Sequence, residues 1–421
     1  MFTYNRNLLH SPTYSWIFAE DRIRFKALAD SSGVLKVPTA WHNHSWSQNC
    51  TYDWHISVDW WPYVSYSWTW WTWVGKCITV ASWLEANSEH IIEIRVYDVH
   101  DNYWWALAFW WHSSWIESRL KEIIVDSTFL WFAVNATSTW NYFRYYQYCW
   151  CTNLINAYDE YLPATVLDTW TNFRCYQYYG CTSLVTPWTE SAPNSITEIK
   201  DNFRMYQYCW CTSLINSSVE VMPWTVTYIW AHFRWWQYCN CRNITTAAAE
   251  VLPPNLVTIY TDFRCNQYEW CSNLVTISDE FLPNTVRSIE TWFRLCQFKD
   301  CPKLTHNAKE AMSSSLTSLA YHYRHQQYQN CTGITRLDVM SVPNSLSNHY
   351  YCRHQWLNNT GNTTNKMTIY CYWDRVEYWD SGSYLDWNRV AAMYVPVNLV
   401  QWYRDSWFWS MVSDDKIMAL S

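Results

Sequence analysis

The sequence contains 421 residues with a formal net charge of −7, and it includes 6 glycines and 35 tryptophans. This length allows more than one domain and a large buried core, whereas the mild negative charge argues against a nucleic-acid-binding protein, which needs a concentrated basic face. No run of about 18 apolar residues predicts a transmembrane helix, and the first residues lack the apolar segment of a signal peptide. An average composition would give roughly 30 glycines, so glycine is scarce and tryptophan abundant.

Residues 1–100 predict a small β-sandwich-like domain. The segments DRIRFKAL, TYDWHISVDWW and EHIIEIRVYD alternate apolar and polar residues between turn signals. This order of loops and strands is typical of immunoglobulin-like or fibronectin-like sandwiches. The aromatic stretch at 60–74 is interrupted by Pro62, serines and threonines, which favours a β-hairpin region. Residues 101–142 are expected to hold a partial repeat that caps the following region.

A repeat of 30 residues occupies residues 143–350 in seven units. Each unit has an aromatic residue, an arginine directly after it, a glutamine four residues after it and a cysteine eight residues after it. The cysteine column consists of Cys151, Cys181, Cys211, Cys241, Cys271, Cys301 and Cys331. Such a period indicates a solenoid, in which every unit buries its apolar face against its neighbours. The sequence therefore predicts a mainly β, leucine-rich-repeat-like solenoid whose cysteines stack as an interior ladder.

The repeat resembles the BspA-like leucine-rich repeats of bacterial surface proteins. The segments CTSLVTPWTESAPNSITEI and CSNLVTISDEFLPNTVRSI carry the resemblance, which covers roughly residues 130–360. The chain departs from that family in its longer unit, its FRxxQY block and its tryptophans at glycine-like turn positions. The resemblance implies a curved solenoid used in adhesion or protein binding, and it implies no catalytic residue.

One column raises a question about the tryptophans themselves. The residue before each ladder cysteine is Trp150, Gly180, Trp210, Asn240, Trp270, Asp300 or Asn330. Glycine, asparagine and aspartate tolerate a left-handed turn, whereas tryptophan does not belong to that set. The segment VDWWPY at 58–63 likewise has tryptophans where a two-residue hairpin turn favours glycines.

Two hypotheses explain these tryptophans. In the first, many of their codons are UGA, which the source organism reads as glycine and which is translated here as tryptophan. In the second, the tryptophans are genuine and form exposed stacking surfaces. The codons distinguish the two, because UGG codons would exclude recoding.

The 17 cysteines do not predict a metal site or any other cofactor. Cys149 and Cys151, like Cys209 and Cys211, form Cys-x-Cys pairs, whereas zinc sites usually have Cys-x2-4-Cys and a second pair. The second cysteine of each pair belongs to the ladder column, and a buried free cysteine behaves as a small apolar residue.

The arginine column has two interpretations. Like charges stacked about 5 Å apart repel unless they are solvated or paired, and a glutamate column at Glu160, Glu190, Glu220, Glu250, Glu280 and Glu310 offers structural pairing. Alternatively, the arginines and nearby aromatic residues, which include Tyr145 and Tyr146, form a face for acidic glycans or a protein partner. The candidate ligand-binding residues are Arg174, Arg204, Arg234, Arg264, Tyr176, Tyr206, Trp235 and Trp236.

Residues 351–421 predict a degraded repeat and a C-terminal cap. A strand ending at Pro396 is expected to lead into a helix from about Asn398, with Val397, Val400, Tyr403 and Trp407 on one stripe. A terminal helix is a suitable cap because the last strand otherwise exposes an edge.

These features together predict a non-enzymatic adhesion or recognition protein that binds a protein or glycan partner at a bacterial cell surface or on a phage particle. A carbohydrate-binding or carbohydrate-active protein with genuine exposed tryptophans is one alternative. It requires a carboxylate pair for catalysis, and no such pair is apparent outside the ladders. A purely structural spacer is the other alternative.

Overall fold

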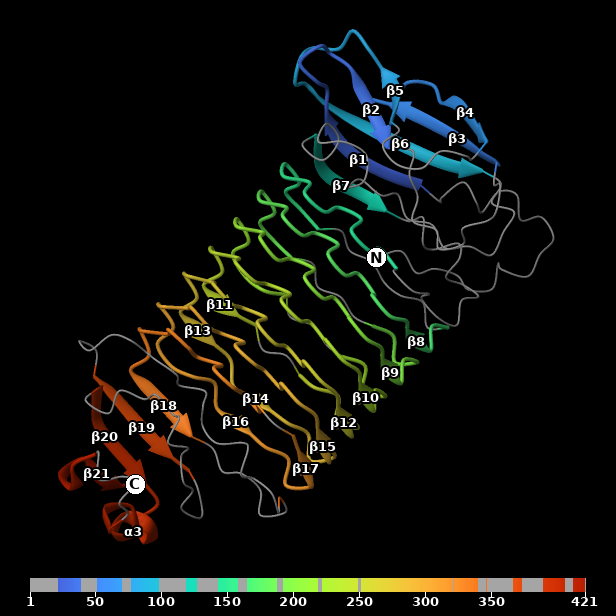
Figure 1. Cartoon of the computed structure of the whole chain (residues 1–421). Helices are drawn as coiled ribbons and strands as arrows, with labels where there is room; N and C mark the ends of the chain where they lie inside the picture. The colour runs from blue at the N-terminus through green and yellow to red at the C-terminus, as the bar shows by residue number, and fades with distance from the viewer. Residues whose placement is uncertain are drawn as a thin grey trace, which may run out of the picture.

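The computed structural model describes residues 22–38, 51–69, 77–97, 119–126, 143–157, 165–187, 192–218, 222–248, 251–320, 322–339, 346, 366–372, 389–405 and 412–420. Figure 1 shows an N-terminal antiparallel sheet, a long stack of parallel coils, and a C-terminal parallel sheet with one short helix. The predicted mainly β fold with a repeat solenoid is thereby confirmed. No helix in the described part of the chain has the length and apolar character needed to cross a bilayer.

The N-terminal sheet has five antiparallel strands in the order β4-β3-β6-β1-β7, and β2 and β5 form a separate two-stranded ribbon. The strands are β1 (Arg22–Leu28), β2 (Leu35–Pro38), β3 (Thr51–Val58), β4 (Val64–Thr69), β5 (Cys77–Ala81), β6 (Glu89–Tyr97) and β7 (Leu120–Asp126). Alternation along β1 buries Ile23 and Phe25 on one face of the sheet, and both belong to the same apolar cluster as Val37 of the ribbon. The alternating pattern in the sequence thus reflects a sheet with one buried face.

The segment VDWWPY lies in the hairpin between β3 and β4, but the turn runs from Val58 to Val64 and is longer than the predicted two residues. Ile56 pairs with Val64 across the hairpin, and Asp59 and Trp60 in its turn have φ angles of 47° and 68°. The turn is therefore left-handed where the sequence suggested a preference for glycine.

Two-residue strands recur every 30 residues and pair in parallel with the next unit. The six-stranded sheet contains β8 (Asp168–Thr169), β9 (Glu198–Ile199), β10 (Tyr228–Ile229), β12 (Thr258–Ile259), β15 (Ser288–Ile289) and β17 (Ser318–Leu319). Two smaller parallel pairs join β11 (Thr246–Ala247) to β13 (Thr276–Ile277), and β14 (Glu280–Phe281) to β16 (Glu310–Ala311). Each residue pairs with its counterpart in the neighbouring unit, so the sequence period equals one coil of the solenoid.

Apolar ladders fill the solenoid. Phe143 to Tyr323 stack with ring centroids 5.1–5.5 Å apart, and Tyr148 to Tyr328 stack at 5.3–5.5 Å. The seven ladder cysteines form no disulfide and are fully buried. From Cys181 onward, each thiol donates to a carbonyl oxygen of the previous unit at 3.0–3.2 Å. The cysteine column is therefore a packing ladder with hydrogen bonds between adjacent units.

A buried glutamine ladder runs beside the aromatic stacks. Six consecutive bonds join Nε2 of one glutamine to Oε1 of the glutamine in the preceding unit, from Gln177 to Gln147 through Gln327 to Gln297, at 3.0–3.2 Å. Because a buried amide needs hydrogen-bond partners, this column is retained in all seven units.

Both ends of the solenoid are covered by the flanking sheets. At the N-terminal end, the side chain of Asn156 bonds to the backbone nitrogen and oxygen of Ile123 in β7 at 3.0 and 2.8 Å. At the other end, the backbone of His306 forms an isolated parallel β-bridge with Arg336 of β18. The parallel sheet then continues through β18 (Arg336–Val339), β19 (Met367–Cys371), β20 (Val390–Val395) and β21 (Ile417–Ala419).

The predicted C-terminal helix is present but short. A 3-10 turn at η5 (Val397–Leu399) leads into α3 (Val400–Asp405). Tyr403 is fully buried, as the stripe predicted, but Val397 is exposed because it lies in the 3-10 turn before the helix. Trp407 lies outside the described residues.

Candidate functional site

The segment between the aromatic and cysteine columns has an unusual backbone. In one unit, Asn202, Arg204, Tyr206 and Trp210 have φ angles of 60°, 53°, 57° and 66°. Within this segment the Arg204 nitrogen donates to Phe173 in the preceding unit at 2.8 Å, whereas the Tyr206 nitrogen donates to Trp235 in the following unit at 2.9 Å. Each segment is thus held from both sides, which fixes the positions of the side chains that it carries.

The structure brings together the four predicted aromatic residues. Tyr176, Tyr206 and Trp236 form one column, with ring centroids 4.6 and 5.6 Å apart. Trp235 lies 5.9 Å from Tyr206 in the adjacent position. All four are half-buried and form part of the outer surface of the solenoid.

The four predicted arginines are buried and do not lie on this surface. Arg174, Arg204, Arg234 and Arg264 are only 0–3% exposed. Each guanidinium lies over the phenylalanine of its own unit, at 4.8–5.1 Å from the ring centroid. The left-handed backbone at each arginine turns it inward beside the preceding phenylalanine. The neutralising glutamates Glu160, Glu190, Glu220 and Glu250 lie outside the described residues.

The aromatic surface extends further than the predicted residues. Tyr146 stacks on Tyr176 at 4.5 Å, Tyr179 lies 5.6 Å from Tyr176, and Trp270 meets Trp236 edge-on at 5.7 Å. We call this surface the aromatic face; it comprises Tyr145, Tyr146, Tyr176, Tyr179, Tyr206, Trp235, Trp236 and Trp270. Tyr179 and Trp270 belong to other columns of the repeat, so their place in this face follows from spatial contact alone.

Tyr176, Tyr179 and Tyr206 of the aromatic face remain protonated at neutral pH. Burial raises the pKa of Tyr179 and of Tyr206 to about 12, with nearby thiols adding to the effect. Burial also raises the pKa of Tyr176. The hydroxyls of Tyr176, Tyr179 and Tyr206 are therefore neutral.

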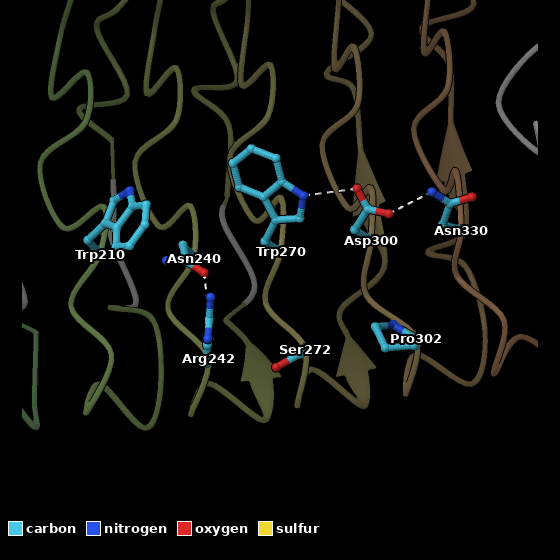
Figure 2. Close-up of a pocket in the computed structure, with 8 residues that line it drawn as sticks. All are labelled: Trp210, Asn240, Arg242, Trp270, Ser272, Asp300, Pro302 and Asn330. Carbon is cyan, nitrogen blue, oxygen red and sulfur yellow. Dashed lines mark hydrogen bonds between the residues drawn. The ribbon is translucent and has the colours of Figure 1, made fainter.

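A groove lies next to the aromatic face (Figure 2). It has a volume of about 640 Å³ and is lined by Trp210, Asn240, Arg242, Trp270, Ser272, Asp300, Pro302 and Asn330. Asp300 Oδ2 accepts a bond from Trp270 Nε1 at 3.0 Å, and Asp300 Oδ1 accepts one from Asn330 Nδ2 at 2.6 Å. The sequence placed Asp300 and Asn330 only in the turn column and gave no signal for Arg242, which occurs in one unit at a position where the others have threonine, serine or proline.

The column of Gly180 is left-handed in all seven units, as its residue types suggested. The φ angles are 59° for Trp150, 73° for Gly180, 66° for Trp210, 58° for Asn240, 63° for Trp270, 59° for Asp300 and 59° for Asn330. The ring of Trp150 lies over Gly180, 2.5 Å from where a Cβ atom would stand. Three tryptophans therefore occupy a conformation that L-residues adopt at a cost of roughly 1–2 kcal/mol each.

His232 at the edge of the aromatic face gives a pH-dependent prediction. Its Nε2 lies 3.2 Å from Asp262 Oδ2, and the hydrogen bond to Asp262 raises the pKa of His232, although burial opposes this. The pair therefore stabilises the fold fully below the ordinary histidine pKa of about 6.5, and the stabilisation is lost as pH rises through the higher folded value.

We expect an NMR titration of the His232 ring to give a midpoint above about 6.5. Asp262→Asn should lower that midpoint. An unchanged midpoint in the variant would contradict the assigned ion pair.

Within the part of the chain that the structure describes, no three histidine, cysteine, aspartate or glutamate side chains lie close enough to hold a metal ion. Comparison of the chain with protein families, with curated protein sequences and with solved structures finds no match. The described geometry is therefore that of a repeat solenoid with an aromatic outer face and an adjoining groove.

Proposed function

We propose that the protein is a non-enzymatic recognition protein that binds a protein or glycan partner through the aromatic face. The observation that carries this proposal is the chain of ring contacts from Tyr145 to Trp270 over successive units. Tyrosine and tryptophan supply large contact areas with little loss of conformational freedom, and they are enriched among the residues that dominate binding energy. A parallel solenoid holds them on a scaffold that is already ordered before binding.

The resemblance to BspA-like repeats supports a role in adhesion at a bacterial cell surface or on a phage particle. Solenoids present extended surfaces of this kind because each added unit lengthens the same face. Burial of the arginine column favours a partner that recognises aromatic surface over a partner held by a row of cations.

The double variant Tyr176→Ser, Tyr206→Ser tests this proposal. We expect at least a tenfold loss of binding to whichever target the unchanged protein retains on a glycan array and a panel of extracellular-matrix proteins, since each central aromatic contributes roughly 1–2 kcal/mol or more. The control is Tyr228→Ser, because Tyr228 is an exposed tyrosine on β10, away from the aromatic face.

Equal losses in the double variant and the Tyr228 control would contradict the proposal. Absence of binding to every target would favour the structural-spacer alternative. Melting temperatures of all variants would show whether a loss of binding follows from unfolding.

A further inference from the structure

We propose that the groove between Trp210 and Trp270 is the binding site for a neutral, extended β-1,4-linked glycan. This inference rests on the proposed recognition function and specifies the ligand class and the residues that hold it. It is carried by three features of the groove: exposed indole rings, a fixed set of polar groups, and a repeat spacing that suits a polymer.

The indole rings provide the stacking surfaces. Trp210 and Trp270 are 41% and 40% exposed, and both line the groove. Trp270 is held on one side by its contact with Trp236 at 5.7 Å and on the other by its bond to Asp300. Figure 2 shows the Trp270 ring with one face turned toward the viewer. A fixed aromatic face of this kind matches the apolar C–H face of a pyranose ring, because stacking buries both without ordering a mobile side chain.

The polar groups suit hydroxyl groups. Asp300 accepts one bond on each oxygen, from Trp270 and Asn330, and a carboxylate has about four acceptor positions. Arg242 is exposed and uses Nε to bond Asn240 Oδ1 at 2.8 Å, and the guanidinium carries further donors. Sugar hydroxyls both donate and accept, so they can engage both groups. One carboxylate and one guanidinium balance each other, which favours a neutral ligand over the acidic glycan expected from the arginine column.

The spacing favours a polymer aligned with the solenoid. Trp210 and Trp270 occupy the same position two units apart, and adjacent parallel coils rise about 4.8 Å per unit, which places the two residues roughly 10 Å apart along the axis. In a β-1,4-linked chain, every second sugar presents the same face. The length of one sugar along the chain is about the rise from one coil to the next. An extended glycan can therefore place equivalent faces over both rings.

The left-handed backbone bears on whether both indole rings are present in the natural protein. Trp210 and Trp270 carry φ angles of 66° and 63° in a column where other units have asparagine, aspartate or glycine. The same conformation occurs in all seven units and at Trp83, so it bears on which residues stand at 210 and 270 and does not by itself mark a binding site. Recoding of both codons to glycine is the competing explanation, and it would remove both rings.

The first test is the mass of the peptides that contain residues 210 and 270 in protein from its natural source. Tryptophan at both positions is the expected result, and glycine at both positions overturns the proposal. The second test is isothermal titration calorimetry of the full chain with cellohexaose and chitohexaose, with maltohexaose as an α-linked comparison.

We expect binding of at least one β-linked hexasaccharide, and at least a tenfold weaker affinity in Trp270→Gly and in Asp300→Ala. Trp270→Gly is informative because it relieves a strained residue, so loss of binding with an unchanged or higher melting temperature cannot come from unfolding. Trp83→Gly is the matched control, since Trp83 is also left-handed but belongs to the N-terminal domain. The affinity of the Trp83→Gly variant for the β-linked hexasaccharide should equal that of the unchanged protein.

Unchanged affinity in Trp270→Gly, equal binding of maltohexaose, or no binding of either β-linked hexasaccharide would each overturn the groove proposal. The broader recognition function is tested separately, by the Tyr176→Ser, Tyr206→Ser double variant. If the Tyr176→Ser, Tyr206→Ser double variant binds some other target more weakly than the unchanged protein does, the aromatic face remains the proposed binding surface. Only the proposal of a glycan site in the groove is then excluded.

Discussion

Trp83→Gly is expected to raise the melting temperature of the protein, although it removes the largest side chain and introduces the smallest. Trp83 has a φ angle of 68°, and its side chain is 96% exposed, so almost no burial is lost. A left-handed L-residue costs roughly 1–2 kcal/mol, which glycine avoids, and the greater freedom of glycine in the unfolded chain offsets about half. The expected net gain is about 0.5–1 kcal/mol, measured by thermal and urea denaturation.

Two other substitutions serve as controls, because both are expected to lower the stability of the protein. Trp230 is not left-handed, stacks on Tyr260 at 4.7 Å and donates to Glu198, so Trp230→Gly should lower stability. Gly180→Ala should also lower it, because Gly180 has a φ angle of 73° and a Cβ atom there would meet the Trp150 ring. A loss of stability in Trp83→Gly would contradict the argument from backbone strain.

The same strain bears on the two hypotheses for the tryptophan codons. Trp60, Trp83, Trp150, Trp210, Trp236, Trp270 and Trp292 are all left-handed. Recoding predicts glycine in the natural protein at such positions, whereas genuine tryptophan predicts UGG codons. Trp83 is the clearest test of recoding, since its ring points into solvent, whereas Trp270 is the clearest test of function, since its ring is bonded within the groove.

Gln237→Leu is expected to destabilise the fold by about 2–4 kcal/mol. Gln237 donates to Gln207 and accepts from Gln267, both at 3.2 Å, and all three side chains are buried. Leucine has similar size but leaves one acceptor on Gln207 and one donor on Gln267 without their ladder bonds. Each buried polar group left without its bond costs about 1–3 kcal/mol, so the midpoint of urea denaturation should fall markedly.

Val251→Thr is the control for this variant, because Val251 is exposed and a surface change of this kind stays within about 0.5 kcal/mol. Equal stability of Gln237→Leu and the unchanged protein would show that the glutamine ladder contributes no net stability. Circular dichroism would confirm that the variant keeps the β content of the solenoid.

The repeat made several structural features predictable. Its 30-residue period defines one coil, and columns of identical residue type must stack, since equivalent residues of parallel coils face one another. The interior cysteine ladder follows from this logic. The left-handed turn column was also predictable, because Gly180, Asn240 and Asp300 share a tolerance for that conformation. The C-terminal helix was predictable from its pattern, but its start was not, since a 3-10 turn precedes it.

Tertiary structure alone decided which side chains reach the surface. A simple alternation places Arg204 on the side opposite Phe203, but the left-handed backbone turns both inward, so the arginines became interior residues. The aromatic face and the groove depend on contacts between different columns of different units, such as Trp236 with Trp270 and Trp270 with Asp300. Sequence periodicity orders residues along a column, whereas the distance between columns is set by the fold of each coil. The sequence therefore determined the solenoid and its ladders, and the folded coils determined which side chains form its outer surface.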